Sequence, residues 1–232
     1  MANKLVIPQR PLPYFDPRKV PIVGVDNHLP AIHADLLQPS ALKQRFAQPP
    51  VWHPELVAEK RFSDKALTPA SVLIPIVMRD RPTVLLTERT LHLSNHSGQI
   101  AFPGGKADGD DLDTTVTALR EAYEEVGLHA KYIHVLGELP HYSTGSGFVI
   151  TPVVGLVETG FTLTRNPFEV ADTFEVPLDF LMNPANHRRH IVEWDGEKRE
   201  WLSMPYEDQL TQRFIWGATA GILRNFYRML LS

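Results

Sequence analysis

The hydrophobic and polar positions of the chain divide it into two parts. Ten of the 20 prolines precede Asp64, and proline fixes φ and removes a hydrogen-bond donor, so we expect this part to be mostly irregular. One short helix is predicted at residues 40–46, with Ser40 as its N-cap. Aromatic residues favour packing over disorder, and this part has Tyr14, Phe15, Trp52 and Phe62. We divide the chain into an N-terminal extension, residues 1–66, and a main domain, residues 67–232.

In the main domain, short apolar runs predict β-strands. Residues 72–77 are apolar and β-branched, and Pro75 indicates that their hydrogen bonding is interrupted or lies at an edge. Residues 83–87 complete a predicted hairpin across the turn Arg81-Pro82. Further strands are predicted at residues 132–136 and 148–157, and a late hairpin at 192–194 and 200–202 around Asp195-Gly196, a favoured turn pair.

Two segments have the period of an amphipathic helix. One spans residues 113–126 and the other spans residues 212–230. The second has apolar residues at helical spacing: Phe214, Ile215, Ala218, Ile222, Leu223, Phe226 and Leu230. Strands before and after a central helix, without regular βαβ alternation, predict a mixed α+β sandwich.

Composition narrows the class of protein. The chain has 232 residues, of which 43% are hydrophobic and 22% charged, as in an ordinary globular domain. The net charge of −4 offers no broad basic surface for nucleic acid, and the run at residues 188–190 is interpreted as a solvated loop. The absence of cysteine excludes disulfides, cysteine nucleophiles and thiolate metal sites.

The chain shows no signal for secretion or for membrane insertion. Its first 15 residues lack a basic segment followed by a long apolar run, and no window reaches the roughly 18 apolar residues of a membrane helix. We therefore expect a cytoplasmic protein with neither a nucleic acid nor a membrane as partner. A homodimer is left open.

The helix at residues 113–126 concentrates acidic side chains. At about 100° per residue, its apolar residues fall on one side, which we expect to be buried: Val116, Leu119, Tyr123 and Val126. Its three glutamates fall on the other side: Glu121, Glu124 and Glu125. Gly104-Gly105 precedes the helix as a turn, and Gly127 can end it in the left-handed conformation.

Three neighbouring carboxylates repel one another, and like charges four residues apart destabilise a helix. A divalent cation relieves this repulsion, and ligation by oxygen alone suits Mg²⁺ or Mn²⁺, which also bind phosphate oxygens. Such an ion screens a diphosphate, polarises phosphorus and lowers the pKa of a bound water. The alternative is a solvated acidic face. The glycine turn, the acidic loop and the spacing of the glutamates favour the metal site.

The segment from Gly105 to Leu128 resembles the Nudix box: glycine, five residues, glutamate, seven residues, Arg-Glu, an apolar residue, any residue, Glu-Glu, any residue, glycine, an apolar residue. Residues 120–128 match its last part, with Ala122 at the first apolar position. Asp111 stands where glutamate is usual, and eight residues rather than seven separate it from Arg120.

The resemblance implies that the three glutamates bind the metal and that the Gly105 carbonyl completes its shell. It implies that Arg120 orients a carboxylate by a charge-assisted contact. It also implies the Nudix fold, an α/β/α sandwich with a mixed sheet.

Residues 85–105, just upstream, are similar to the signature of coenzyme A diphosphatases: LLTxR, a basic region, a glycine and FPGG. The residues that match best are Arg89, His96, Gly98, Gln99 and the run Phe102-Pro103-Gly104-Gly105. Ser94 stands where arginine is expected. The resemblance implies that Arg89, His96 and Gln99 bind substrate, Arg89 by gripping a phosphate. The alternatives are a strand-end ion pair for Arg89 and a capped or core position for His96.

Two further segments bear on catalysis. Nudix enzymes often take another acidic residue from the region after the last long strand, as base or as extra ligand. Glu169 is the candidate and Glu175 the reserve, against the alternative of an exposed glutamate at a helix start. Residues 140–148 form a polar, glycine-bearing loop that is either a substrate loop or a plain connection.

The sequence therefore predicts an Mg²⁺- or Mn²⁺-dependent diphosphatase whose partner is a small diphosphate molecule. The expected substrate is coenzyme A or an acyl or oxidised form of it, cleaved to 4′-phosphopantetheine and adenosine 3′,5′-bisphosphate. Glu121 or Glu169 would accept the proton of the attacking water. The alternatives are another Nudix substrate, such as NADH, a nucleotide sugar or a nucleoside triphosphate, and a non-catalytic nucleotide-binding regulator.

Overall fold

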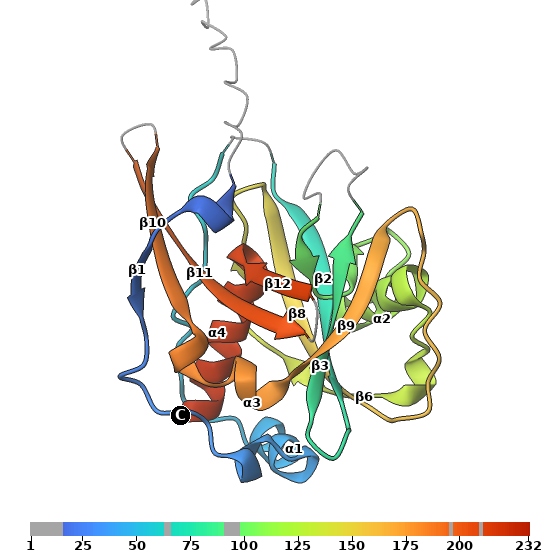
Figure 1. Ribbon diagram of the computed structural model, residues 1–232. Coiled ribbons are helices and arrows are strands. Elements are labelled where there is room, and N and C mark those ends of the chain that lie inside the picture. The colour runs from blue at the N-terminus through green and yellow to red at the C-terminus, as the bar shows by residue number, and fades with distance from the viewer. Residues whose placement is uncertain (1–15, 63–65, 91–97, 195–196, 209–210) are drawn as a thin grey trace, which may run out of the picture.

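Two β-sheets and two long helices build the part of the protein that the structure describes (Figure 1). It is described by a computed structural model that covers residues 16–62, 66–90, 98–194, 197–208 and 211–232. In these residues the larger sheet has eight strands, in the order β4-β3-β2-β8-β6, with β5 paired to β2, β7 to β8 and β9 to β3. Their bounds are β2 Thr68–Val77, β3 Thr83–Arg89, β4 Ile100–Ala101, β5 Gly104–Lys106, β6 Ile133–Glu138, β7 Tyr142–Ser143, β8 Phe148–Val157 and β9 Val170–Pro177.

The larger sheet is mixed, as predicted, because β2 and β8 run parallel whereas its other pairs are antiparallel. On its other side β2 pairs with β5 through residues 70–72 and with β3 through residues 76–77. Pro75 lies in the gap between these two ladders. The predicted interruption of hydrogen bonding at this proline is therefore confirmed.

The helix α2 (Thr114–Val126) covers one face of this sheet (Figure 1). Its predicted ends are confirmed: the Asp113 carboxylate accepts a hydrogen bond from the Val116 amide at 2.8 Å, and Gly127 has a φ of 70°. The predicted buried stripe is wrong in part, because Val116 and Tyr123 are 37% and 51% exposed. Val126 of the predicted stripe is buried, and the small residues Ala118 and Ala122 complete the buried side and bring the helix close to the sheet.

The opposite face of the larger sheet packs against α4 (Gly217–Leu231) and a second, antiparallel sheet. This sheet has the order β1-β10-β11-β12, with bounds Ile22–Val25, Arg188–Trp194, Glu197–Asp208 and Thr211–Trp216. The pairing of β10 with β11 confirms the late hairpin. The predicted start of the last helix is wrong, since residues 211–216 pair with β11 as a strand and Gly217, with a φ of 61°, turns the chain into α4.

The described part of the extension packs on the main domain. Its strand β1 pairs with β10, and Leu37 and Leu42 belong to the core on the α4 side. Its helix α1 spans Pro39–Ala47, and the short 3₁₀ helices η1 and η2 span Pro17–Lys19 and Ala34–Leu37. The prediction of Ser40 as N-cap is wrong: Pro39 opens the helix and Gln38 is the N-cap residue, without a side-chain cap. The division of the chain after residue 66 stays a prediction.

Charged groups also join the extension to the main domain. We call Asp26, Glu55, His187, Arg189 and Arg224 the extension cluster. Arg189 contacts Asp26 at 2.7 Å and Glu55 at 2.7 Å. Arg224, which is 1% exposed, contacts the same two carboxylates at 3.1 and 2.7 Å. The buried Asp26 and the partly exposed Glu55 are thus paired with the buried Arg224 and the partly exposed Arg189.

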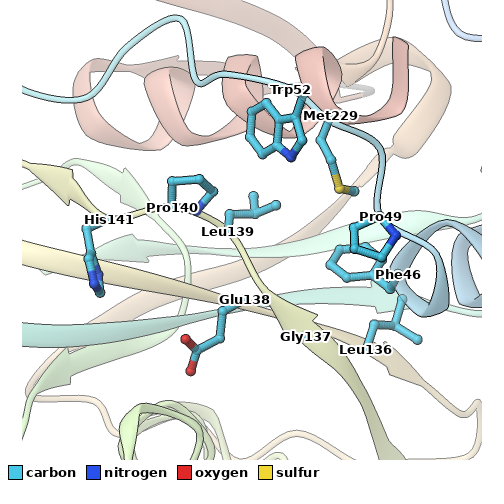
Figure 2. A pocket seen from close by; sticks show the side chains of 10 residues that line it. All are labelled: Phe46, Pro49, Trp52, Leu136, Gly137, Glu138, Leu139, Pro140, His141 and Met229. Atoms are coloured by element: carbon cyan, nitrogen blue, oxygen red, sulfur yellow. The ribbon is translucent and has the colours of Figure 1, made fainter. Parts of the chain in front are cut away.

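The extension, β6 and α4 also line an open, mostly apolar pocket of about 460 Å³ (Figure 2). Trp52 and Phe46 come from the extension and Met229 from α4. Glu138 points away from them, toward α2, and its carboxylate contacts the Thr114 hydroxyl. The glutamates of α2 are not among the lining residues, so this pocket is separate from the predicted site. In the described part of the chain, no helix is long and apolar enough to cross a membrane.

Candidate active site

Glu125 is the most deeply placed of the three glutamates of α2. It is 2% exposed. One of its carboxylate oxygens accepts a hydrogen bond from the Gly104 amide at 3.1 Å, and the other lies 3.4 Å from Nη1 of Arg89. The glycine turn and the end of β3 therefore meet at this carboxylate. Arg89 therefore forms the ion pair at a strand end that was predicted as the alternative to substrate binding. Its partner, Glu125, belongs to the candidate site.

The two glycines of β5 are required by their surroundings. A Cβ atom at Gly105 would lie 2.4 Å from the carboxyl carbon of Glu121. A Cβ at Gly104 would lie 2.5 Å from the Ser71 carbonyl oxygen, and the φ of Gly104 is 156°. The absence of side chains lets the Glu121 carboxylate rest against the backbone of the turn.

Arg120 joins the acidic loop to the helix. Its guanidinium donates to Asp111 at 3.0 and 2.8 Å, to Glu121 at 2.9 Å and to Glu124 at 3.0 Å. Its remaining contact is the Lys106 carbonyl at 3.0 Å. The predicted contact between Arg120 and a carboxylate is thus present in the structure.

Asp111, the residue that departs from the Nudix pattern, has a clear structural partner. Hydrogen bonds from Arg120, from the Asp108 amide and from the Thr117 hydroxyl hold the pKa of Asp111 well below its usual range. The loop that is one residue longer still delivers a carboxylate to Arg120. Asp111 therefore anchors Arg120 and lies outside the group of carboxylates around Gly105.

Glu169 approaches the helix glutamates from the turn before β9. Asn166 connects the two regions: its amide donates to the Glu125 carbonyl at 2.8 Å and its side chain donates to Glu169 at 3.1 Å. The charge of Glu169 contributes to the raised pKa of both Glu121 and Glu125. Glu169 stands in a turn, so its alternative reading as a helix-start residue is wrong. Glu175 is bound to Arg79 at 2.6 Å, farther along β9.

We call Glu121, Glu124, Glu125 and Glu169 the acidic cluster. Burial is the largest cause that raises the pKa of Glu125, to about 7, and the charges of Glu169 and Glu121 add to it. Burial also raises the pKa of Glu121, and so do the charges of Glu124 and Glu169, against the opposing effect of Arg120. Both shifts have the sign expected where carboxylates crowd without enough positive charge.

The donor set of the acidic cluster suits Mg²⁺ or Mn²⁺, because it consists of carboxylates beside a turn without side chains. A cation there would offset both the cost of burying these charges and the repulsion between them, which together raise the two pKa values. In the present side-chain positions, no three acidic or histidine residues among those described are close enough together to hold a metal ion. Glu124 pairs instead with Arg120, so this side chain must turn away from the arginine to bind a cation.

The substrate signature is described only in part. Arg89 is in place beside Glu125, and the Gln99 carbonyl accepts a hydrogen bond from the Arg89 amide at 3.0 Å. The predictions for His96 and Ser94 fall outside the described residues. In the loop at residues 140–148, Glu59 of the extension accepts hydrogen bonds from the Gly145 amide at 2.8 Å and the Tyr142 hydroxyl at 3.2 Å. Sequence reasoning missed Glu59 and Asn166, and no local motif marks either of them.

Comparisons with known proteins were made against families, curated proteins and solved structures. Residues 67–207 match the family described as the NUDIX domain. A protein of Yersinia pestis (strain Pestoides F), described as "Uncharacterized Nudix hydrolase NudL", is 47% identical over 157 residues, which cover 67% of this chain and 76% of that protein. NudL of Yersinia pseudotuberculosis serotype O:1b (strain IP 31758) has the same identity and coverage.

Two solved structures match about half of this chain. An Ap4A hydrolase of C. elegans, in a binary complex, has a TM-score of 0.42 and 16% identity and covers 51% of this chain and 86% of its own. The NUDIX domain of Shewanella oneidensis NrtR, complexed with ADP ribose, has a TM-score of 0.38 and 23% identity. It covers 49% of this chain and 75% of its own.

Proposed function

The chain belongs to the Nudix family and is a Nudix hydrolase, and on this premise we propose that it hydrolyses the diphosphate of coenzyme A or of an acyl or oxidised form of it. The products would be 4′-phosphopantetheine and adenosine 3′,5′-bisphosphate. The observation that most directly supports this proposal is the contact between Arg89 and Glu125 at 3.4 Å. It joins the coenzyme A-like signature upstream to the acidic cluster of the Nudix helix.

Each member of the site has a proposed role. Glu121, Glu124, Glu125 and the Gly105 carbonyl would hold Mg²⁺ or Mn²⁺. When bound, the ion supplies charge screening for the diphosphate and a more acidic water. Arg89 would bind a phosphate of the substrate, since a guanidinium matches phosphate oxygens in bidentate geometry. Arg89, which now pairs with Glu125, would be free to bind the substrate when the charge of Glu125 is offset.

The proton of the attacking water needs a carboxylate acceptor. Glu121 and Glu169 both lie at the cluster, and Asn166 fixes the orientation of Glu169 through its side-chain amide. The Arg120 guanidinium holds the Glu121 carboxylate by a hydrogen bond of 2.9 Å. We propose Glu169 as the base, because Glu121 is already engaged by Arg120 and placed against Gly105. His96 and Gln99 stay predictions as substrate-binding residues.

A hydrolysis assay with coenzyme A and Mg²⁺ or Mn²⁺, with products identified by mass, tests the proposal. We expect 4′-phosphopantetheine and adenosine 3′,5′-bisphosphate in equal amounts, and no products after chelation of the metal. Turnover of NADH, a nucleotide sugar or a nucleoside triphosphate instead would keep the Nudix chemistry and reject the substrate. Tight nucleotide binding without any turnover would support the alternative of a regulator and reject the enzyme.

A further inference from the structure

The pairing of β3 with β9 changes register beside Arg89. The register is regular from Thr83 opposite Pro177 to Glu88 opposite Asp172. Arg89 then pairs with Val170, so that Ala171 is an extra residue on β9. A β-bulge of this kind bends the strand and re-aims a side chain, and bulges are frequent next to active sites.

The two residues that face each other just before the bulge are both acidic. Glu88 and Asp172 lie directly opposite in the antiparallel ladder, where like charges are destabilising. Unless a cation lies between them, their repulsion would push apart the strands at the point where Arg89 leaves the sheet. The pairing therefore needs a positive group at this position.

Arg213 of β12, in the second sheet, supplies a positive group to both carboxylates, whereas Arg165 pairs with Asp172 alone, at 3.0 Å. Its Nη1 donates to Glu88 at 2.6 Å and its Nη2 donates to Asp172 at 2.5 Å. The side chain is 7% exposed, and its guanidinium lies over the ring of Phe174 at 4.2 Å. The planar fork of an arginine spans two carboxylates on two strands, whereas the ammonium group of a lysine is a single point of charge.

The residues next to this contact belong to the candidate site. Arg89 directly follows Glu88 and reaches Glu125. The amide of Thr90 donates to the Glu169 carbonyl at 3.0 Å, so the far side of the bulge holds the backbone of the candidate base. The end of β3 thus contacts two members of the acidic cluster. Arg89 reaches the Glu125 carboxylate, and Thr90 holds the backbone of Glu169.

The segment that contains Arg213 also supports the other end of the coenzyme A-like signature. The Thr219 hydroxyl at the start of α4 donates to the Ile100 carbonyl of β4 at 3.0 Å. Glu88 lies just before Arg89, and Ile100 just after Gln99. The C-terminal segment therefore contacts the signature at two places, Glu88 and Ile100.

We propose that Arg213 is a positioning residue for the hydrolase. It closes the β-bulge between β3 and β9 and thereby positions Arg89 and Glu169 beside the glutamates of α2. The inference rests on the proposed function through the roles of Arg89 in binding a phosphate of the substrate and of Glu169 as the base. Arg213 itself contacts neither Glu125 nor Glu169 among the interactions described.

The test compares Arg213→Met, Arg213→Lys and the wild type in steady-state kinetics with coenzyme A, alongside thermal unfolding. Methionine keeps an apolar side chain over Phe174 and removes the charge. We expect the KM of Arg213→Met to rise roughly tenfold, as after the loss of a charge-assisted contact, with a smaller rise for Arg213→Lys. If both variants change only the melting temperature and leave KM and kcat as in the wild type, the role is purely structural and the proposal is overturned.

Arg79→Gln is the matched control. Arg79 also binds a carboxylate of β9, Glu175, but does so farther along the strand from the acidic cluster. We expect a small loss of thermal stability and a KM within about twofold of the wild type, as for distant independent sites. An equal rise of KM in Arg79→Gln and Arg213→Met would show a general effect of loosening β9 and would overturn the proposal.

A double-mutant cycle with Arg89→Ala tests the route of the effect. If Arg213 acts mainly through Arg89, Arg213→Met changes the KM of the Arg89→Ala enzyme by less than about twofold. Full additivity of the two effects overturns the proposal.

If coenzyme A is not a substrate but another nucleoside diphosphate derivative is, the substrate proposal fails and the cycle is measured with that compound. If nothing is hydrolysed, the affinity for adenosine 3′,5′-bisphosphate, measured by calorimetry, replaces KM.

Discussion

The extension cluster and the acidic cluster both bury carboxylates, but they balance the charge differently. In the extension cluster, burial raises the pKa of Asp26 and of Glu55. The positive charges and hydrogen bonds that Arg189 and Arg224 supply outweigh it, so both pKa values are lowered. In the acidic cluster the pKa of Glu121 and of Glu125 is raised instead. Burial alone therefore does not distinguish the two places, since it acts in the same direction in both.

The difference lies in the number of partners. Two arginines with short contacts face two carboxylates in the extension cluster. In the acidic cluster Glu125 has Arg89 at 3.4 Å, and Arg120 is shared between Asp111 and two glutamates. A cluster that contains its own counter-charges serves stability, whereas one with surplus negative charge favours a cation from outside.

The largest expected effect separates the clusters by stability. Arg224→Met removes a buried partner of Asp26 and Glu55, and the loss of one member of a buried ion pair typically costs about 3–5 kcal/mol. We expect a loss of this size in the free energy of unfolding, measured by urea denaturation. The control is Arg228→Met, one turn along α4, whose side chain is 38% exposed and lies 3.6 Å from Glu55. It should cost less than about 1 kcal/mol. Equal losses in the two variants would contradict the distinction.

The next effect separates the clusters by activity. Glu125→Gln keeps an oxygen for the Gly104 amide but removes a charge from the acidic cluster. We expect kcat to fall by roughly 10²–10³, the range found when a key electrostatic group is removed from an active site. The metal-free variant should be at least as stable at pH 7 as the metal-free wild type, because neutralising one carboxylate reduces repulsion. Thermal unfolding in the presence of a chelator measures this. A variant that is inactive because it is unfolded would contradict the assignment.

The smallest effect concerns pH, to which the two clusters respond in opposite directions. Burial lowers the pKa of His187 to about 4, so its contribution to stability is complete above about pH 6.5 and is lost as the pH falls toward 4. The pKa of Glu125 is raised to about 7, so its penalty is present above pH 7 and disappears as the pH falls toward its ordinary value. In the metal-free wild type these effects oppose each other between pH 7 and 4.5.

Glu125→Gln removes one of the two opposing effects. On acidification from pH 7 to 4.5 we expect the metal-free variant to lose more stability than the metal-free wild type. A shift of this size in one pKa corresponds to a difference of up to about 3 kcal/mol. Urea denaturation at the two pH values measures it. Parallel losses in the two proteins would show that Glu125 is not held in a repulsive environment.

Sequence reasoning found the features that depend on neighbours along the chain. Asp113 and Gly127 end α2 where predicted, and the strand at residues 148–157 has its predicted bounds. The glycine turn and the spacing of the glutamates likewise indicated the site. The family match supports the Nudix assignment that this spacing suggested. Caps, turns and helix faces are set by local hydrogen bonds and period, which a sequence displays directly.

The errors share a different cause. Residues 211–216 have an apolar pattern compatible with a helix, but pairing with β11, a partner chosen by tertiary structure, makes them a strand. Large apolar residues at Val116 and Tyr123 suggested the wrong stripe of α2, because close packing on the sheet selects Ala118 and Ala122 instead. In both cases the deciding neighbour lies far away in the sequence.

The sequence by itself determined the acidic helix, its glycine turn and the resemblance to a family of metal-dependent hydrolases. Only the tertiary structure decided which further residues meet this helix. It brought Glu169 rather than Glu175 to the acidic cluster, placed Arg213 behind Arg89, and paired Glu55 of the extension with Arg224 of α4. These groups are separated by up to 169 residues, and contacts over such distances follow from strand pairing and core packing, which local patterns do not encode.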